Sequence, residues 1–311
     1  MVANSQVLAI VVTYNRRILL ENCISALLHQ TYPLRHLLII NNASTDDTHN
    51  WIQASGLLQH PQLTYHLTKE NLGGAGGFAT GLQIALERGA DWVWMMDDDA
   101  EPVRNALAEL ITIAAKPTNI YGSLAIHGTE TAWNTTLLLD DGSQRLVRNI
   151  NEVPDKARVQ FLPFLGLLVS RSLVERIGLP DADFFIAADD AEYCLRANRA
   201  GAEIIVAGKS HINHPKSCSQ TFKVPWGTFV YLSLPPWKRY YDTRNRLLIA
   251  RKYHGYRLVT QTIPGSLVRL VLALWFEPHK LAQLWAFSAG LFDGLLGIKG
   301  KRHIWWKIVN H

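Results

Sequence analysis

Residues 92–99 read WVWMMDDD, an apolar run that ends in three consecutive aspartates. A run this apolar is typical of a buried strand, so the acids are expected to emerge from the core. Adjacent carboxylates repel one another and lose hydration there, and a bound cation relieves both costs. Because alternate residues of a strand point the same way, Asp97 and Asp99 are predicted to hold one divalent ion, with Asp98 on the other side. A solvated acidic turn is the alternative interpretation.

Strand and helix patterns alternate through the first 100 residues. A buried-strand run occupies residues 7–13 and further strands are predicted at 36–40, 63–67 and 92–96, while helical patterns occupy 18–28, about 45–55 and 78–88. This alternation predicts an α/β fold with a mostly parallel sheet flanked by helices. Weaker patterns predict strands at 121–126, 161–169 and 203–206 and a helix from 189 to about 200. From Pro264 on, the pattern becomes helical and amphipathic.

Polar clusters follow the predicted strands at their carboxyl ends, where α/β sheets bind ligands. We therefore expect these clusters to form one site. They are Thr13-Tyr14-Asn15, Asn41-Asn42, residues 69–77 and Asp97–Asp99. The glycine-rich stretch NLGGAGGF, residues 71–78, brings bare backbone to the start of a helix, a setting that can host a diphosphate. It matches neither common phosphate-loop pattern, and close packing of a helix on the sheet is the other explanation of its glycines.

A second acidic group, Asp189, Asp190 and Glu192, lies at the start of a predicted helix. Capping of the helix explains one of these acids but not all three. The preceding apolar residues 184–188 would half-bury a carboxylate and raise its pKa toward that of a general base. Further along, His211 is the first choice as an additional metal ligand and His214 the second, and imidazole favours manganese over magnesium. A purely structural histidine is the competing interpretation.

Charge divides the chain unevenly. Residues 1–205 carry 15 Lys and Arg against 23 Asp and Glu, whereas residues 206–311 carry 16 against three, together with six of the ten tryptophans. Tryptophan with basic residues is typical of membrane-interface anchors, so an anionic membrane surface is the expected partner, and nucleic acid is not. One helical face at 281–295 fits this prediction. A helical hairpin or a dimer contact is the alternative use of that face, which makes a homo-oligomer compatible with the sequence.

The three cysteines, Cys23, Cys194 and Cys218, form no metal-binding or redox pair and are expected to be free thiols in a reducing compartment. The N-terminal stretch lacks the basic segment of a signal peptide. No run of about 20 uninterrupted apolar residues, the length of a spanning helix, is expected. The predicted location is cytoplasmic, peripheral on the inner face of the cell membrane.

Five motifs together resemble family 2 inverting glycosyltransferases of the GT-A fold. They are TYNR at 13–16, NASTD at 42–46, NLGGAGGF at 71–78, DDD at 97–99 and DDAEY at 189–193. The resemblance covers about residues 7–255, including YYDTRN at 240–245, and is nearest to the bacterial galactofuranosyltransferase and rhamnosyltransferase branch. It implies a GT-A domain at 1–255, with a nucleotide-binding part at 1–100 and an acceptor-binding part at 101–255. Residues 256–311 would be a basic, membrane-associated helical region.

The resemblance also implies a role for each matching residue. Contacts to the nucleotide sugar are implied for Thr13, Tyr14, Asn15, Asn42, Asp46, Asn71, Gly73, Gly74 and Asp98. Mn²⁺ or Mg²⁺ on the diphosphate would be held by Asp97, Asp99 and His211. Asp190 would be the catalytic base, with Asp189 or Glu192 holding the acceptor. The implied reaction is transfer of galactofuranose from UDP-galactofuranose to a lipid-linked saccharide in cell-surface polysaccharide synthesis.

Three other functions are weighed against this one. A rhamnosyltransferase that uses dTDP-rhamnose is the nearest. A nucleotidyltransferase needs a glycine-rich loop after the first strand, and residues 14–17 contain no glycine. A non-catalytic sugar-binding or scaffold protein at the membrane needs no acids at two separate places.

Overall fold

The computed structural model describes residues 5–216, 219–224 and 227–308, and the chain forms two compact units. Unit 1 comprises Met1–Asp181 and Tyr193–Lys216. Unit 2 comprises Ala182–Glu192 and Ser217–His311. Helix α6 (Asp189–Arg199) begins in unit 2 and continues in unit 1.

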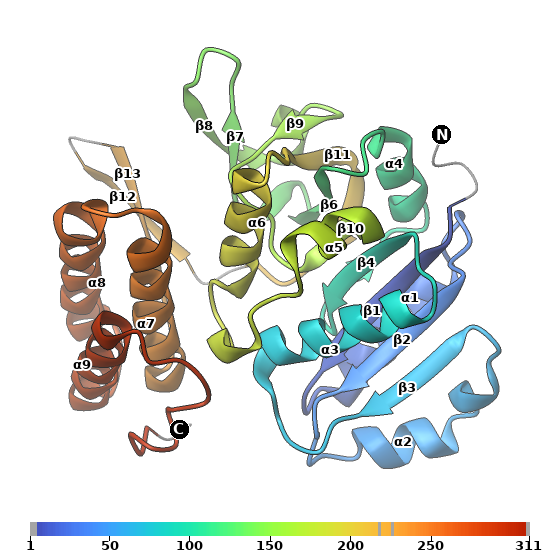
Figure 1. The fold of residues 1–311 in the computed structure, drawn as a ribbon, viewed down its shortest axis with the longest axis horizontal. Helices are drawn as coiled ribbons and strands as arrows, with labels where there is room; N and C mark the ends of the chain where they lie inside the picture. The colour runs from blue at the N-terminus through green and yellow to red at the C-terminus, as the bar shows by residue number, and fades with distance from the viewer. Residues whose placement is uncertain (1–4, 217–218, 225–226, 309–311) are drawn as a thin grey trace. The chain divides into compact units, whose positions relative to one another are not determined.

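Unit 1 is built on an 11-stranded sheet whose main path runs β3-β2-β1-β4-β10-β6-β11-β5 (Figure 1). Its first half is parallel and follows the predicted strands as β1 (Val7–Thr13), β2 (His36–Asn41), β3 (Leu63–Leu67) and β4 (Trp92–Asp97). In the second half, β10 (Leu165–Ser170) runs antiparallel to β4 and to β6 (Ile120–His127), and β11 (Ile204–Asn213) is parallel to β6. The predicted α/β class is confirmed.

Further helices and strands complete this unit. The helices are α1 (Arg17–Leu28), α2 (Thr48–Ala54), α3 (Gly73–Glu87), α4 (Ala106–Ile113) and α5 (Arg171–Ile177), and the remaining strands are β5 (Glu101–Pro102), β7 (Glu130–Leu138), β8 (Gln144–Asn149) and β9 (Ala157–Arg158). Single 3₁₀ turns lie at Leu57–Gln59 and Ile150–Glu152. Two features differ from expectation: α3 starts within the glycine-rich stretch, and β11 extends through His211.

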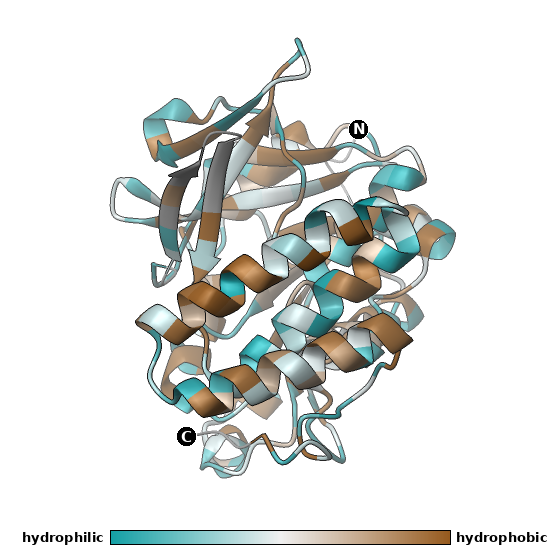
Figure 2. Cartoon of the chain, turned by 90° about the vertical axis from the view of Figure 1, so that its left-hand side faces the viewer, coloured by the Kyte–Doolittle hydropathy of each residue, from teal (hydrophilic) through white to brown (hydrophobic). Residues whose placement is uncertain are grey.

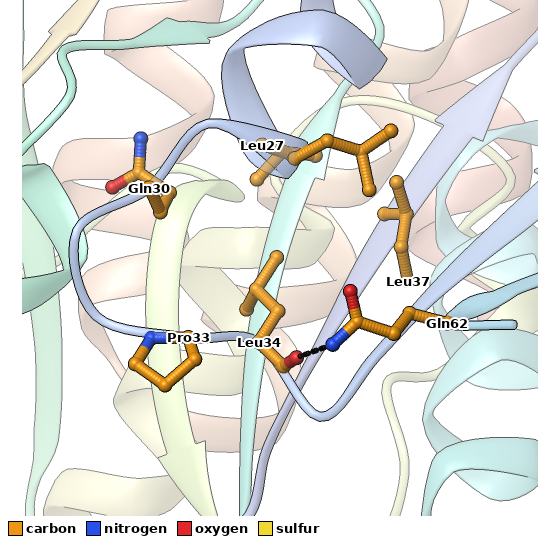
Figure 3. Close-up of a pocket in the computed structure, with 7 residues that line it drawn as sticks. Leu27, Gln30, Pro33, Leu34, Leu37 and Gln62 are labelled. Carbon is orange, nitrogen blue, oxygen red and sulfur yellow. Dashed lines mark hydrogen bonds between the residues drawn. The ribbon is translucent and has the colours of Figure 1, made fainter. Parts of the chain in front are cut away.

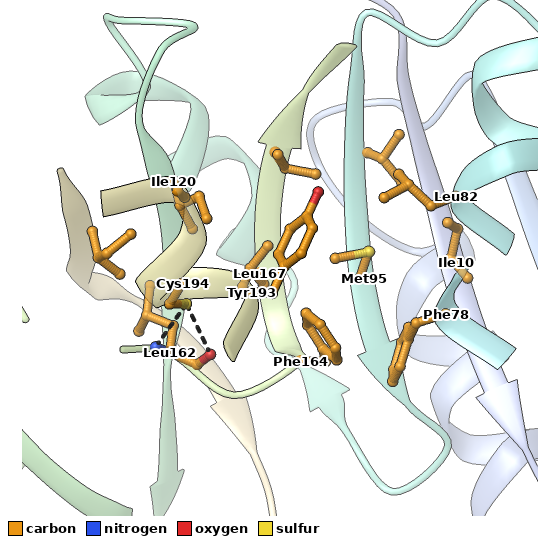
Figure 4. Close-up of a cluster of buried hydrophobic side chains, with 14 of the residues drawn as sticks. Ile10, Phe78, Leu82, Met95, Ile120, Leu162, Phe164, Leu167, Tyr193 and Cys194 are labelled. Atoms are coloured by element: carbon orange, nitrogen blue, oxygen red, sulfur yellow. Dashed lines mark hydrogen bonds between the residues drawn. The ribbon is translucent and has the colours of Figure 1, made fainter. Parts of the chain in front are cut away.

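Apolar side chains cover both faces of the sheet because its central strands are apolar at nearly every position. On one face, Ile10 of β1 and Met95 of β4 pack with Phe78 and Leu82 of α3 (Figure 4). Helix α3 approaches closely, since a Cβ added at Gly77 would lie 2.5 Å from Cγ1 of Val12. The packing explanation therefore holds for this glycine.

Unit 2 contains a two-stranded sheet and a set of helices. Its elements are a 3₁₀ turn at Ala182–Phe184, β12 (Ser219–Val224), β13 (Gly227–Leu232), α7 (Pro236–Tyr253), a π-helical turn at Leu258–Thr262, α8 (Ile263–Phe276) and α9 (Lys280–Leu296). Helix α9 packs on α7 through small residues, because a Cβ at Gly290 would lie 2.5 Å from the Tyr240 carbonyl oxygen. The buried Asp293 of α9 accepts hydrogen bonds from Tyr240 Oη (2.5 Å) and Trp306 Nε1 (2.8 Å).

The apolar face predicted on α9 is exposed. Leu281 is 84% exposed, Trp285 51% and Phe292 50%, and apolar residues recur along α8 and α9 (Figure 2). The segment Leu258–Phe276 is also long and apolar enough to cross a membrane by length and composition, and only 11% of it is buried. Arg269 interrupts this segment, so it contains no uninterrupted run of about 20 apolar residues, although it satisfies the length and overall composition of a spanning helix.

Two of the three cysteines lie in the described residues. Cys23 and Cys194 are buried free thiols, as expected, and Cys218 lies outside the described residues.

Candidate active site

Two of the three aspartates at the end of β4 share one positively charged side chain, Arg16. Arg16 Nη1 lies 2.7 Å from Asp99 Oδ2 and 3.3 Å from Asp98 Oδ1. Asp98 is only 3% exposed, and its Oδ2 accepts a hydrogen bond of 2.7 Å from Thr13 Oγ1 at the end of β1. Burial raises the pKa of Asp98 to about 6 despite these contacts. Asp97 is the half-buried last residue of β4, in register with Val12.

His214 lies directly beside this acidic group. Its Nε2 is 3.2 Å from Asp99 Oδ1, and its Nδ1 lies 2.6 Å from the Pro215 carbonyl oxygen, which can only accept a hydrogen bond. Burial acts against the charge of Asp99, but His214 and Arg16 together lower its pKa. The other candidate, His211, lies within β11, and its Nε2 is 2.7 Å from the Gly208 carbonyl oxygen.

Asp99 and His214 could supply two ligands to a divalent cation, but the described residues contain no group of three or more His, Cys, Asp or Glu side chains placed to hold one. With Nδ1 donating to Pro215, a neutral His214 presents the lone pair of Nε2 to Asp99, and a backbone carbonyl that orients the imidazole is typical of metal-ligating histidines. Asp99 Oδ1 is buried and accepts no hydrogen bond within the described residues. A nitrogen lone pair and a carboxylate oxygen that face each other require a proton or a cation between them. Oxygen and imidazole ligands suit manganese.

The loops after β1 and β2 are joined through Asn15. Its Oδ1 accepts from the backbone N–H groups of Thr45 (2.6 Å) and Asp46 (3.3 Å), and its own N–H donates to Ser44 Oγ (3.0 Å). Asn15 has a left-handed backbone with φ 56°, which asparagine tolerates better than most residues. The neighbouring Tyr14 is 40% exposed, so its ring is available for stacking.

Asn42 connects β2 to the glycine-rich stretch. It is 2% exposed, its Oδ1 accepts from Leu72 N (2.8 Å), and its Nδ2 donates to the Gly73 carbonyl (2.8 Å). The side chain thus positions the first turn of α3. Asn71 Oδ1 accepts from Gly73 N (2.8 Å), and a Cβ at Gly74 would meet no atom within 4 Å. The start of α3 therefore offers open backbone, which favours an anion.

In unit 2, a strained loop precedes the second acidic group. Phe185, Ala187 and Ala188 all have positive φ, between 59° and 70°, although none is glycine. Each such residue costs about 1–2 kcal/mol. The loop is held by Asn245 of α7, whose Nδ2 donates to the carbonyls of Phe184 (3.0 Å), Ile186 (2.9 Å) and Ala187 (2.7 Å). Strain that is maintained in this way is typical of functional sites.

The acids at the start of α6 have different surroundings. Burial raises the pKa of both Asp189 and Asp190, and the charge of Asp190 raises that of Asp189 further. Glu192 is 1% exposed, and its Oε1 accepts from Tyr253 Oη (2.5 Å) and Lys252 Nζ (3.1 Å) of α7. Glu192 therefore joins α6 to α7, while the Asp189–Asp190 pair has the raised pKa of a base.

One cavity of unit 1 lies away from this chemistry. It has a volume of about 120 Å³ and is lined by Leu27, Gln30, Pro33, Leu34, Leu37 and Gln62, among others (Figure 3). These residues come from the end of α1, the loop that follows it, the start of β2 and the position before β3, whereas the acidic and glycine-rich groups lie at the strands' carboxyl ends. Among the described residues, no charged side chain lines it.

Three residues that contact or affect the acidic groups are not among the site residues predicted from the sequence. Arg16 was visible only as part of the TYNR motif, and its contacts with two acids could not be read from it. Asn245 belongs to the YYDTRN motif, which gave no role to any single residue. Arg246 follows that motif, and its charge lowers the pKa of Asp190.

Comparisons with known proteins find a matching family model and several relatives. The model of glycosyl transferase family 2 matches residues 8–178. The galactofuranosyltransferase GlfT1 of Mycobacterium tuberculosis (strain CDC 1551 / Oshkosh) is 33% identical over 251 residues, which cover 77% of this chain and 80% of that protein. The dTDP-rhamnosyl transferase RfbF of Shigella flexneri is 24% identical over 305 residues, covering 96% of this chain and 98% of that protein.

Solved structures share the fold. The crystal structure of GalNAc-T7 with UDP, GalNAc and Mn²⁺ matches 93% of this chain and 57% of that chain with a TM-score of 0.62 and 14% identity. The mannosyltransferase PcManGT of Pyrobaculum calidifontis, in complex with GDP-Man and Mn²⁺, covers 94% of this chain and 88% of that chain with a TM-score of 0.57 and 18% identity. At these identities the likeness shows the fold, and it confirms the GT-A type predicted from the motifs.

Proposed function

The chain belongs to glycosyl transferase family 2 and is a nucleotide-sugar-dependent glycosyltransferase, and from that premise we propose that it transfers galactofuranose from UDP-galactofuranose to a lipid-linked saccharide. The observation that carries the proposal is the carboxylate site at the end of β4, where Asp99 Oδ1 accepts no hydrogen bond from the described residues and lies 3.2 Å from His214 Nε2. The 33% identity to a galactofuranosyltransferase supports the choice of sugar.

Donor binding is assigned to unit 1. Tyr14 offers its exposed ring to the uracil, within the loops that Asn15 joins to Asp46. The backbone amide of Gly74 would face the diphosphate, because the Gly73 N–H already donates to Asn71 Oδ1. Asp97, Asp99 and His214 would hold Mn²⁺ or Mg²⁺, which offsets the negative charge of the departing nucleotide. His214 replaces His211 in this proposal because it is His214 that contacts Asp99.

Proton transfer is assigned to unit 2. Asp190 accepts the proton of the acceptor hydroxyl while that oxygen forms a bond to the anomeric carbon of the sugar. The bond from that carbon to UDP breaks on the opposite face, so the configuration inverts. The raised pKa of the Asp189–Asp190 pair brings it nearer to neutral pH, where a general base is most effective.

Membrane association is assigned to α8 and α9. Their exposed Trp275, Leu281, Trp285 and Phe292 would enter the lipid interface, and the basic residues after 205 would face anionic headgroups on the cytoplasmic leaflet. Flotation with anionic and with neutral liposomes tests this assignment. The protein should float with the anionic vesicles at low salt, and its recovery in the soluble fraction would contradict the proposal.

A rhamnosyltransferase is the second candidate. The rhamnosyl transferase RfbF aligns with 96% of this chain, which extends into the helices of unit 2. One experiment separates the two: the purified protein is incubated with UDP-galactofuranose or dTDP-rhamnose, Mn²⁺ and a lipid-linked saccharide, and the released nucleotide is identified. Release of UDP with a galactofuranosylated product supports the first proposal, and release of dTDP alone replaces it with the second.

A further inference from the structure

The C-terminal segment, residues 300–308, is bonded to the loop that precedes the acids of α6 (the base loop, residues 182–188). Gly300 N donates to the Asp183 carbonyl oxygen at 2.8 Å. Arg244 of α7 is fully buried at this contact. Its guanidinium donates to three carbonyl oxygens, those of Gly300 (2.5 Å), Asp183 (3.0 Å) and Phe184 (2.8 Å). A buried charge needs such bonds to offset its lost hydration, so α7, the base loop and the C-terminal segment are joined at one guanidinium.

A cluster of aromatic rings holds the strained part of the base loop. Phe185 is buried and has a left-handed backbone with φ 64°. Its ring stacks on Tyr241 of α7, with 5.0 Å between centroids, and lies 5.6 Å from the ring of His303. Tyr241 Oη and His303 Nδ1 are 2.7 Å apart, and the Trp237 ring lies 5.9 Å from His303. A strained residue persists only when its surroundings fix it, and His303 is the contribution of the C-terminal segment to those surroundings.

The C-terminal segment is itself fixed to α9. Arg302 Nε (3.0 Å) and Trp306 Nε1 (2.8 Å) both donate to Oδ2 of Asp293, a fully buried residue of that helix. The Trp306 ring also lies 5.6 Å from the ring of Trp285 and 5.9 Å from that of Phe292. Because these contacts do not involve the base loop, they can keep the segment in place against the strain of the loop.

The base loop leads directly into the first turn of α6. Ala187 and Ala188 have positive φ, and the Ala188 carbonyl oxygen accepts from Glu192 N at 3.0 Å. The backbone that carries Asp190 therefore starts from the strained residues. A change of conformation at Phe185 would reach this carboxylate within a few residues.

We propose that the C-terminal segment is a positioning element of the active site, which holds the base loop in its strained conformation through His303 and the carbonyl contacts of Arg244. The segment thereby places Asp190 for proton transfer. This inference rests on the proposed function, in which Asp190 is the base. His303 and Arg244 are positioning residues, because they act through the loop. Residues expected from the sequence to belong only to a membrane-associated region thus gain a second role.

Transfer kinetics and UDP titration on the full chain test the proposal. His303→Ala should lower kcat about tenfold or more, because small displacements of a reacting group are costly, while UDP affinity in the presence of Mn²⁺ stays within about twofold. His303→Asn keeps a hydrogen-bonding group near the position of Nδ1 and should restore kcat to within about threefold. Ile304→Ala, which removes a neighbouring side chain that is 62% exposed, is the matched control and should keep the wild-type kcat. Wild-type kcat in His303→Ala, or an equal loss of kcat and UDP affinity, would overturn the proposal.

A double-mutant cycle separates positioning from a general loss of stability. Phe185→Ala removes the ring through which His303 acts. In that background, His303→Ala should lower kcat by less than about threefold, since the two rings belong to one path. Losses that multiply fully in the double variant would refute the proposed path.

Hydrogen exchange measures the base loop without turnover. Two of its amides donate to carbonyls of the loop itself, Phe185 N to Ala182 and Ile186 N to Phe184. In His303→Ala and in Arg244→Lys, exchange in the peptide 182–188 should become about tenfold faster or more, while the peptides of β1 and β4 exchange as in the wild type. Unchanged exchange of the loop in both variants would contradict the proposal. If the wild type transfers no sugar to any acceptor, the proposed function fails instead, and exchange still decides whether the C-terminal segment holds the loop.

Discussion

Replacing Asn245 with alanine should release the loop that carries the base. The Asn245 amide donates to three carbonyls at 2.7–3.0 Å, and an NH₂ group can make two of these bonds at full strength. Each buried carbonyl left without a donor costs about 1–3 kcal/mol, so the free energy of unfolding should fall by about 2–4 kcal/mol. The strained residues Phe185, Ala187 and Ala188 would then return to negative φ and displace Asp190.

The effect is read in two assays. Urea denaturation measures the free energy of unfolding, and transfer kinetics measure kcat. We expect kcat to fall at least tenfold, because an increase of about 1.4 kcal/mol in the activation free energy is sufficient for that decrease. UDP affinity should be unchanged, since Asn245 belongs to unit 2. Asn198→Ala is the matched control, because Asn198 is exposed and makes one bond of 3.2 Å to the Ala202 carbonyl. A wild-type kcat in Asn245→Ala, despite lost stability, would refute the idea that the strained loop positions the base.

Three further outcomes are expected. The base must be unprotonated, and burial raises the pKa of Asp190, so kcat/KM should fall as the pH drops from about 7 to 5. An ordinary aspartate titrates lower, near pH 4, so a flat kcat/KM profile down to pH 5 would contradict this prediction. Gly77→Ala places a Cβ 2.5 Å from Val12 and should lower the free energy of unfolding by about 1–3 kcal/mol in urea denaturation; an unchanged midpoint would show that α3 moves freely. His214→Ala should raise the Mn²⁺ concentration for half-maximal UDP binding about tenfold or more, whereas His211→Ala should change it less than twofold, and the reverse order would return the ligand role to His211.

The parallel half of the sheet could be predicted because β1, β2 and β4 are largely apolar runs with polar residues at their ends. Helix α7 could not, since its buried positions include Arg239, Asp242, Arg244 and Asn245, and a charged interior produces no amphipathic pattern. The β7–β8 hairpin was also missed. Its strands mix polar and apolar residues without regular alternation.

The acidic and glycine-rich parts of the site could be predicted from their positions after the strands. The choice between the two histidines could not. The pairing of β11 with β6 shifts register between Ala207 and His211, so simple alternation along the strand does not tell which ring faces Asp99. Likewise, the contact between Arg16 and the acids joins residues more than 80 positions apart, which local patterns cannot reveal.

The central claim assigns two roles to two groups of acids: one binds the donor, and the other removes a proton. Asp190→Asn and Asp99→Asn should be compared in a single titration of UDP in the presence of Mn²⁺, with the transfer rate measured on the same samples. We predict that Asp190→Asn keeps UDP affinity within about threefold while transfer falls at least a hundredfold, the usual contribution of a general base. Asp99→Asn should lose both UDP affinity and transfer activity. Loss of UDP binding in Asp190→Asn, or transfer at the wild-type rate, would contradict this division of labour.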